Sequence, residues 1–209
     1  MTVAIEDLSK KIKGTDVLKN ISVTFESGNV YGLCGANGSG KTMLLRAIAG
    51  LIKPSKGQIK IGKNVLHQDI SFPESLGIII ENMELLPYMT AKDNLVLLSK
   101  IKKVASEEDI DDALDRVGLR TDLKAKKFSL GMRQKLNIAQ AIFEKPDLIL
   151  LDEPTNALDE ESINRVHKIL REEAERGAVV IIATHNKYDL EDCCDSIMRM
   201  HDGQMEVIA

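Results

Sequence analysis

The chain has 209 residues, of which 44% are hydrophobic and 29% charged, as in a globular protein of one domain with room for a sub-domain. Its formal net charge of −4 argues against a general binder of nucleic acid or anionic membranes, because neutralising phosphates needs clustered Lys and Arg. The basic run KAKK at residues 124–127 is expected to be a solvated connection, and no nucleic-acid partner is expected.

The first third of the chain carries strand patterns around one helical pattern. Two β-branched stretches, residues 21–26 and 30–34, flank Ser27-Gly28-Asn29 and predict a hairpin. A helical run begins at Lys41 and ends before Pro54. The stretches GQIKIGK and LGIIIE then predict two further strands.

The middle of the chain changes to helical patterns. Residues 90–143 are predicted to be mostly helix, with capping-box starts at Thr90 and Ser106. Buried strands are predicted at residues 147–152 and in AVVIIAT, on either side of a charged helix, and a hairpin is predicted around Asp202-Gly203.

Strands that alternate with helices imply a largely parallel sheet covered on both faces. We therefore expect an α/β core, mainly a parallel sheet with an antiparallel portion. The core is assigned to residues 1–86 and 142–209, and a helical sub-domain inserted in it to about residues 87–141.

The cysteines and the absence of targeting signals indicate a compartment. Three cysteines, Cys34 and the adjacent Cys193 and Cys194, suit free thiols in a reducing environment. The N-terminus lacks the apolar core of a signal peptide, and the apolar runs are far shorter than the ~18 residues that suggest a membrane span. We expect a cytoplasmic protein, for which another protein would supply any membrane part.

A phosphate-binding motif stands between a predicted strand and a predicted helix. GANGSGKT fits the pattern G-x-x-x-x-G-K-[ST], and the strand and helix around it disfavour a glycine-rich turn that binds nothing. Its glycines let successive N–H groups face one anion at a helix N-terminus, where Lys41 reaches the phosphates and Thr42 a magnesium ion. The expected phosphate-binding residues are Gly35, Ala36, Asn37, Gly38, Ser39, Gly40, Lys41 and Thr42.

Two carboxylates end the buried strand of LILLDEP. Asp152 is placed to hold Mg²⁺, and Glu153 to orient or deprotonate an attacking water, although helix capping is an alternative for both. His185 follows the strand AVVIIAT, and its imidazole would lie near the γ-phosphate. A lone histidine after a strand is more often structural, so only the neighbouring motifs favour this role.

These motifs occur in the order, and near the spacing, of ATP-binding cassette (ABC) ATPases, and the resemblance covers essentially the whole chain. It implies a P-loop NTPase core and a helical sub-domain. SLGMRQ, residues 129–134, resembles the family's signature sequence, usually close to LSGGQ. In the family that helix start binds the γ-phosphate of ATP held by a second ATPase domain, a role that falls on Ser129 and Gly131 here.

Departures from the family pattern point to a subgroup. Leu130 replaces the first glycine of the signature, and Glu81 stands where the family has the Q-loop glutamine. Both departures resemble bacterial ABC ATPases of antibiotic, bacteriocin or drug efflux and immunity. Glu81 would reach Mg²⁺ or the attacking water, with a charged surface loop as the alternative. Ile12 takes the place of the adenine-stacking aromatic residue, and Asp159 belongs to the D-loop at the dimer interface.

The resemblance implies an ATPase subunit of a bacterial exporter, with ATP and Mg²⁺ as cofactors. Its partners would be a second ATPase domain, most simply a second copy, and a separate permease that holds it on the inner face of the membrane. The alternatives are a soluble ABC ATPase acting on nucleic acid or ribosomes, an ATP-binding regulatory module and an importer subunit. Residues 81–99 correspond to the family's permease-docking region, where Met83, Leu85, Leu86, Tyr88 and Met89 are either docking or core residues.

Overall fold

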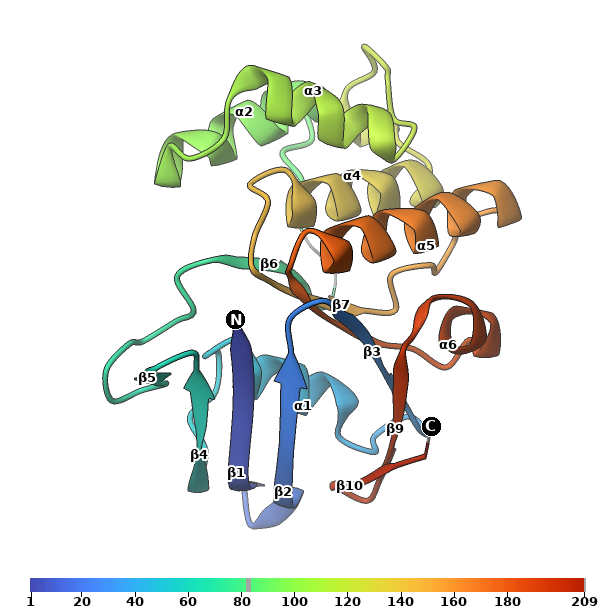
Figure 1. The fold of residues 1–209 in the computed structure, drawn as a ribbon. Helices are drawn as coiled ribbons and strands as arrows, with labels where there is room; N and C mark the ends of the chain where they lie inside the picture. Colours follow the sequence, from blue (N-terminus) through green and yellow to red (C-terminus); the bar gives the residue numbers. More distant parts are fainter. Residues whose placement is uncertain (82–83, 209) are drawn as a thin grey trace.

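A computed structural model describes residues 1–81 and 84–208, whose strands form two sheets (Figure 1). One sheet is antiparallel, in the order β2-β1-β4-β5. Its strands are β1 (Thr2–Ile12), β2 (Thr15–Glu26), β4 (Lys56–Ile61) and β5 (Asn64–Val65). Alternating burial along β1 and β2 places one face of this sheet on the core and the other in solvent.

The second sheet has the order β10-β9-β3-β8-β7-β6 and is parallel except for the pair β9–β10. Its strands are β3 (Asn29–Cys34), β6 (Leu76–Ile79), β7 (Leu148–Asp152), β8 (Val179–Ala183), β9 (Ser196–His201) and β10 (Gln204–Val207). The α/β class with an antiparallel portion is confirmed, as is the hairpin at Asp202-Gly203.

The hairpin predicted at Ser27-Gly28-Asn29 is wrong. β2 pairs with β1 in the antiparallel sheet, whereas β3 lies between β8 and β9 in the parallel sheet. The turn therefore carries the chain from one sheet to the other. The physical reason lies in burial: β3 is covered on both faces and paired at both edges, which leaves no edge for β2. The N-terminal hairpin is instead β1–β2, around Lys13-Gly14.

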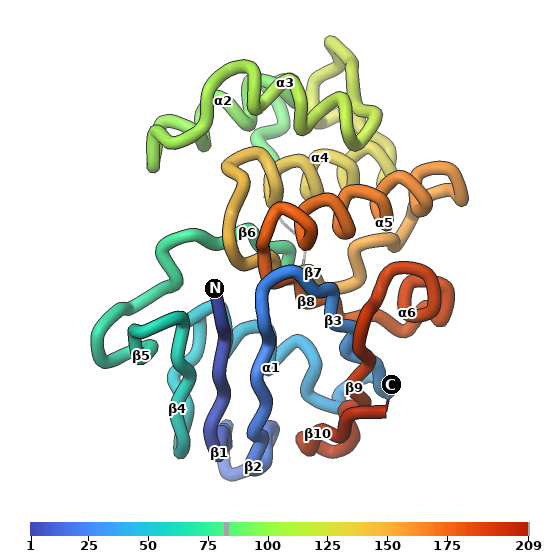
Figure 2. Tube along the Cα trace, in the orientation of Figure 1, coloured from blue at the N-terminus to red at the C-terminus, as the bar shows by residue number. Residues whose placement is uncertain are grey.

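Helices cover both faces of the parallel sheet (Figures 1 and 2). α1 (Lys41–Ile48) lies between the two sheets, while α4 (Leu130–Ile142) and α5 (Glu160–Glu175) cover the other face. α2 (Ala91–Lys102), α3 (Glu107–Arg116) and the short 3₁₀ helix Ala125–Lys127 lie beyond α4, and α6 (Lys187–Cys193) packs on α5 and β3. Both predicted capping boxes, at Thr90 and Ser106, are present. Because α4 contacts β6 as well as α3, the sub-domain boundary at residues 87 and 141 stays a prediction.

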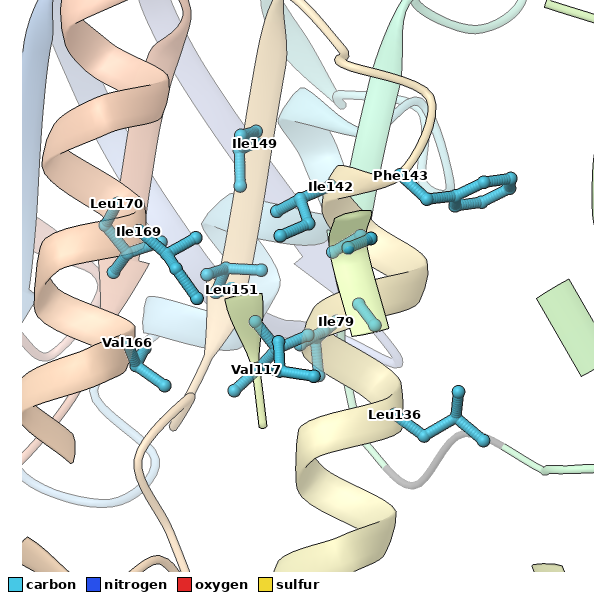
Figure 3. Close-up of a cluster of buried hydrophobic side chains, with 14 of the residues drawn as sticks. Ile79, Val117, Leu136, Ile142, Phe143, Ile149, Leu151, Val166, Ile169 and Leu170 are labelled. Carbon is cyan, nitrogen blue, oxygen red and sulfur yellow. The ribbon is translucent and has the colours of Figure 1, made fainter. Parts of the chain in front are cut away.

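The continuous apolar run of β7 is explained by the two cores it joins. Leu148 and Leu150 pack with α1 and the antiparallel sheet. Ile149 and Leu151 face α4 and α5 on the opposite side, as Figure 3 shows. A strand buried on both faces has no polar positions until it ends, so Asp152 marks the point where β7 leaves the core.

Gly77 in β6 allows the close approach of α4. A Cβ at this position would lie 1.9 Å from the Ala141 carbonyl oxygen and 2.8 Å from Pro146 Cγ. We expect Gly77→Ala to lower the free energy of unfolding, measured in urea, by about 3 kcal/mol, because the strand and the helix must separate. The control is Gly62→Ala, whose Cβ meets open space and whose φ of 59° costs only about 1 kcal/mol. Equal losses would contradict this account.

Candidate active site

The sequence-predicted site residues gather at the carboxyl ends of adjacent parallel strands. β3 leads into residues 35–40, β8 is followed by His185, β7 ends at Asp152, and β6 is followed after one residue by Glu81. Since β3, β8, β7 and β6 are consecutive in the sheet, their carboxyl ends form one edge. Ligands of open α/β sheets bind at such an edge.

The phosphate loop folds as its sequence predicts, from the end of β3 to the start of α1. Gly35 has a φ of 144°, and a Cβ there would lie 2.2 Å from the Met200 carbonyl oxygen, so only glycine fits. Gly40, at a φ of 110°, takes the N-cap position of α1, which has no side-chain cap and no acidic residue in its first turn. The N–H groups of this helix start are therefore available to an anion.

A cavity of about 430 Å³ lies over this loop, and the carboxylates line it. The Lys41 side chain is buried, and its ammonium donates to the carbonyl oxygens of Gly35 (2.7 Å) and Ala36 (3.3 Å). This contact keeps the cation inside the loop, where a phosphate would replace the carbonyl oxygens. The lining residues are Val17, Asn37, Gly38, Ser39, Gly40, Lys41, Thr42, Met43, Asp152 and Glu153.

Thr42 and Asp152 contact each other across this cavity. The Thr42 hydroxyl donates a 2.6 Å hydrogen bond to Asp152 Oδ2. Burial raises the pKa of Asp152, although the Thr42 hydrogen bond opposes this, and the neighbouring charges of Glu153 and Glu81 add to the rise. The charge of Lys41 acts in the opposite direction. The carboxylate is thus half-buried, with its ionised form disfavoured, a place where a cation would stabilise it.

The donor set fits magnesium held jointly with a nucleotide. Among residues 1–81 and 84–208, no group of three or more His, Cys, Asp or Glu side chains is arranged to hold a metal by itself. Mg²⁺ in nucleotide sites takes one or two protein ligands and completes its shell with phosphate oxygens and water. The Thr42 hydroxyl and the Asp152 carboxylate meet that requirement.

Glu153 and His185 form a hydrogen-bonded pair beside the phosphate loop. His185 Nδ1 lies 2.7 Å from Glu153 Oε1. Glu153 Oε2 is buried and has no hydrogen-bond partner among the described residues. Glu153 has a φ of 51°, and its N–H donates to the Ala183 carbonyl oxygen at 2.7 Å. A buried carboxylate oxygen without a donor is available to a substrate water, so the pair has the form of a base with an orienting group.

Glu81 carries the extra charge that the sequence analysis noted, and the structure gives it a counter-ion. Arg46 Nη2 lies 2.6 Å from Glu81 Oε1, one helical turn beyond Thr42 on α1. Because the charge of Glu81 also acts on the pKa of Asp152, the pair stands close to the proposed metal ligands. Arg46 was not identified from the sequence, since an arginine in a helix gives no sign of a partner that lies 35 positions away.

The signature residues lie at the exposed start of α4. Ser129 is its N-cap and accepts the Met132 N–H at 3.2 Å. A Cβ on Gly131 would lie 3.0 Å from the Ala157 carbonyl oxygen, so this glycine packs against the segment after β7. Gln134, to which the sequence analysis gave no role, donates to the carbonyl oxygens of Pro154 (2.7 Å) and Glu153 (3.3 Å). It ties the signature helix to the catalytic segment.

Eight candidate residues are absent from the cavity lining that the described chain provides: Ile12, Gly35, Ala36, Glu81, Ser129, Gly131, Asp159 and His185. Ile12 ends β1 and is partly exposed, whereas Val17 of β2 lines the cavity. Asp159 is the N-cap of α5 and accepts the Ser162 N–H at 2.9 Å. Hydrogen bonding from the Ser162 side chain, and then from its N–H, lowers the pKa of the Asp159 carboxyl. Its capping role does not depend on a partner chain.

The apolar segment after Glu81 is partly buried. Met83 lies outside the described residues. Leu85 packs against the core, whereas Leu86, Tyr88 and Met89 are exposed, with Tyr88 at 71%. Over the part of the chain that the structure describes, helices fall short of the length and apolarity that crossing a bilayer needs.

A strand–loop–helix phosphate cradle with carboxylates at the next strand ends defines a P-loop nucleotide hydrolase. The family described as ABC transporter matches residues 18–156. YybJ of Bacillus subtilis (strain 168), an uncharacterized ABC transporter ATP-binding protein, is 58% identical over 98% of this chain and 94% of its own length. The chain belongs to the ABC transporter family, as an ATP-binding ATPase subunit, which confirms the resemblance.

Two further comparisons extend this result. The bacitracin transport ATP-binding protein BcrA of Bacillus licheniformis is 35% identical over 95% of this chain, which spans 66% of that protein. Among solved structures, the dimeric structure of MJ0796, a bacterial ABC transporter cassette, has a TM-score of 0.87 at 23% identity, with 99% of both chains covered. At that identity the likeness establishes the fold.

Proposed function

We propose that this chain is the ATPase subunit of a bacterial exporter of antibiotic, peptide or drug type. The observation that carries the proposal is Glu81 in the Q-loop position, held by Arg46 and accompanied by the SLGM signature, since both departures resemble the efflux subgroup. Similarity to a bacitracin transport ATP-binding protein supports it. The arginine transport ATP-binding protein ArtM of Bacillus subtilis, 33% identical, represents the competing cargo class of amino acids.

The residues that line the cavity, and those beside it, have distinct roles in this proposal. The loop N–H groups and Lys41 bind the phosphates, and Thr42 and Asp152 hold Mg²⁺, which would neutralise charge on the transferred phosphoryl group. Glu153 orients and deprotonates water, with its carboxylate fixed by His185. Glu81 assists at the metal or the water, and its charge is offset by Arg46.

Each complete site would use two chains. Ser129 and Gly131 of a second copy would close on the γ-phosphate, where a hydroxyl and an unobstructed N–H suit an anion. Ser129 is exposed at the start of α4 and its side chain already caps that helix, so the helix start is preformed for this contact. ATP would then hold the dimer closed, and hydrolysis would release it. Because each site is complete only in the closed dimer, hydrolysis would depend on closure.

A separate permease would hold the dimer on the inner face of the membrane and carry the cargo. The exposed Leu86, Tyr88 and Met89 are the proposed docking residues. The proposal of cytoplasmic placement follows from this partnership. The competing function is a soluble ABC ATPase that acts on nucleic acid or ribosomes.

A pull-down from detergent-solubilised native membranes separates these functions. The bait is Glu153→Gln with ATP and Mg²⁺, expected to hold the closed dimer because hydrolysis is slowed. We expect a polytopic membrane protein in the eluate that disappears when ATP is omitted. Lys41→Ala, which lacks the phosphate contact, is the control bait and should recover much less of it. Recovery of ribosomes, nucleic acid or soluble proteins alone would overturn the transporter proposal.

A further inference from the structure

A buried polar cluster lies behind the active site, on the side formed by α5 and α6. Its centre is the carboxylate of Asp189, which is fully buried in α6. Asp189 Oδ2 accepts the hydroxyl of Thr155 at 2.7 Å and the hydroxyl of Thr184 at 2.9 Å. Its other oxygen, Oδ1, lies 2.8 Å from Nε2 of His167 on α5. Buried ionised groups persist only where such partners compensate the lost hydration.

The two threonines belong to the two catalytic segments. Thr155 comes two residues after Glu153, and Thr184 comes directly before His185. Asp189 Oδ2 therefore binds both the segment that carries Glu153 and the segment that carries His185. On the front side the same segments are joined by the 2.7 Å contact between Glu153 Oε1 and His185 Nδ1. A change in the position of Asp189 would alter the separation of that pair.

His167 is placed to fix this carboxylate as a cation. Its ring is 2% exposed and lies between two carboxylates, with Nε2 on Asp189 and Nδ1 2.8 Å from Asp192 Oδ2. Ionised carboxylates only accept hydrogen bonds, so both ring nitrogens must carry protons to satisfy them. Burial opposes the charge, but the hydrogen bonds with Asp189 and Asp192 raise the pKa of His167. Hydrogen bonds from His167 and the threonines, working against burial, lower the pKa of Asp189.

We propose that His167 is a positioning residue for ATP hydrolysis, which acts through Asp189 on Thr155 and Thr184 to hold Glu153 and His185 at hydrogen-bonding distance. The inference rests on the roles proposed above for Glu153 and His185. His167 is not one of the residues that line the cavity over the phosphate loop. A neutral side chain at position 167 would leave the buried Asp189 carboxylate with its threonine donors but without a cationic partner, and the carboxylate would shift or take up a proton.

The test is steady-state ATP hydrolysis by the full-length chain and its His167→Gln variant. We expect kcat to fall about tenfold and KM for ATP to stay within twofold, because the phosphate loop is untouched while the base and its orienting group lose their alignment. Rates are compared per folded molecule. An unchanged kcat, or a KM that rises with kcat unchanged, would overturn the proposal and leave His167 a purely structural group.

Three further variants keep the test decisive. Lys168→Gln, on the adjacent exposed residue of α5, is the matched control and should hydrolyse ATP like the wild type. In an Asp189→Asn background the effect of His167→Gln should shrink to less than twofold, because both changes act through one carboxylate; independent, multiplying losses would contradict this. If His167→Gln does not fold, Asp192→Asn removes only the outer hydrogen bond and should lower kcat by twofold to threefold, whereas an unchanged kcat would overturn the proposal.

A spectroscopic measurement separates this proposal from the site assignment. The chain has 4 histidines, so imidazole nitrogen signals can be resolved and assigned by substitution. His167→Gln should shift the His185 signal, because its contact with Glu153 loosens, while the His67 and His201 signals stay in place. An unmoved His185 signal counts against the proposal. If Glu153→Gln leaves kcat unchanged, the catalytic roles proposed for Glu153 and His185 are wrong. If Glu153→Gln lowers kcat but His167→Gln does not, those roles stand and the positioning role of His167 is wrong.

Discussion

Glu153→Gln is expected to lower kcat for ATP hydrolysis at least 100-fold while the affinity for ATP changes by less than about threefold. Glu153 Oε2 is buried beside the phosphate loop and lacks a hydrogen-bond partner within residues 1–81 and 84–208, while His185 fixes Oε1. Glutamine keeps the size and one acceptor oxygen, but it cannot take a proton from water. A positioned base contributes ~10²–10⁴ to such a rate, and the phosphate contacts of Lys41 and the loop remain.

Single-turnover hydrolysis and equilibrium binding of ATP measure the two quantities separately. Glu160→Gln is the matched control, since it makes the same substitution at an exposed position at the start of α5 and should leave both quantities unchanged. A fall in kcat of less than about fivefold would remove Glu153 from the role of base. A large loss of ATP affinity would instead place it among the binding groups.

The parts of the site that the sequence predicts are those encoded by contiguous residues. The loop of residues 35–42 and the carboxylates after β7 each stand next to the strand that positions them, so a local pattern contains both the group and its support. The parallel sheet then brings these loops to one edge. The same reasoning failed at Ser27-Gly28-Asn29, because strand partners in a sheet are chosen by burial across the whole fold.

The supporting contacts are non-local and left no trace in the sequence. Arg46 and Glu81 meet because α1 and the end of β6 are neighbours in space, and neither residue has a motif that names the other. His167 occupies an otherwise ordinary amphipathic helix, where a histidine predicts nothing about the aspartates of α6. Gln134 ends the signature segment, yet its acceptors are main-chain carbonyl oxygens, which every sequence supplies. These supporting contacts join residues that are distant in the sequence, so they can be identified only from the three-dimensional structure.

Asp152→Asn is expected to separate stability from activity. Burial and the nearby charges of Glu153 and Glu81 raise the pKa of Asp152, against the opposing effects of Thr42 and Lys41. Ionisation of Asp152 is therefore less favourable in the folded than in the unfolded chain. Asparagine removes that charge and keeps an oxygen for the Thr42 hydroxyl. Without nucleotide, the variant should unfold at a higher urea concentration than the wild type. The same change should lower kcat about 100-fold and raise the Mg²⁺ concentration for half-maximal rate about tenfold, because a metal ligand loses its charge.

The stability difference between Asp152→Asn and the wild type should depend on pH in a defined direction. For a carboxyl whose pKa is raised on folding, the destabilising effect of ionisation is absent at low pH and develops as the pH rises through the folded pKa. The extra stability of Asp152→Asn should therefore be present at pH 7. It should vanish at about pH 3, where Asp152 is largely protonated in both the folded and the unfolded chain. Asp122→Asn, at an exposed position, is the charge-matched control and should change neither stability nor the Mg²⁺ requirement. A variant less stable than the wild type at pH 7 would mean that Asp152 is held for its structural hydrogen bond. A normal Mg²⁺ requirement would leave Thr42 as the metal's anchor.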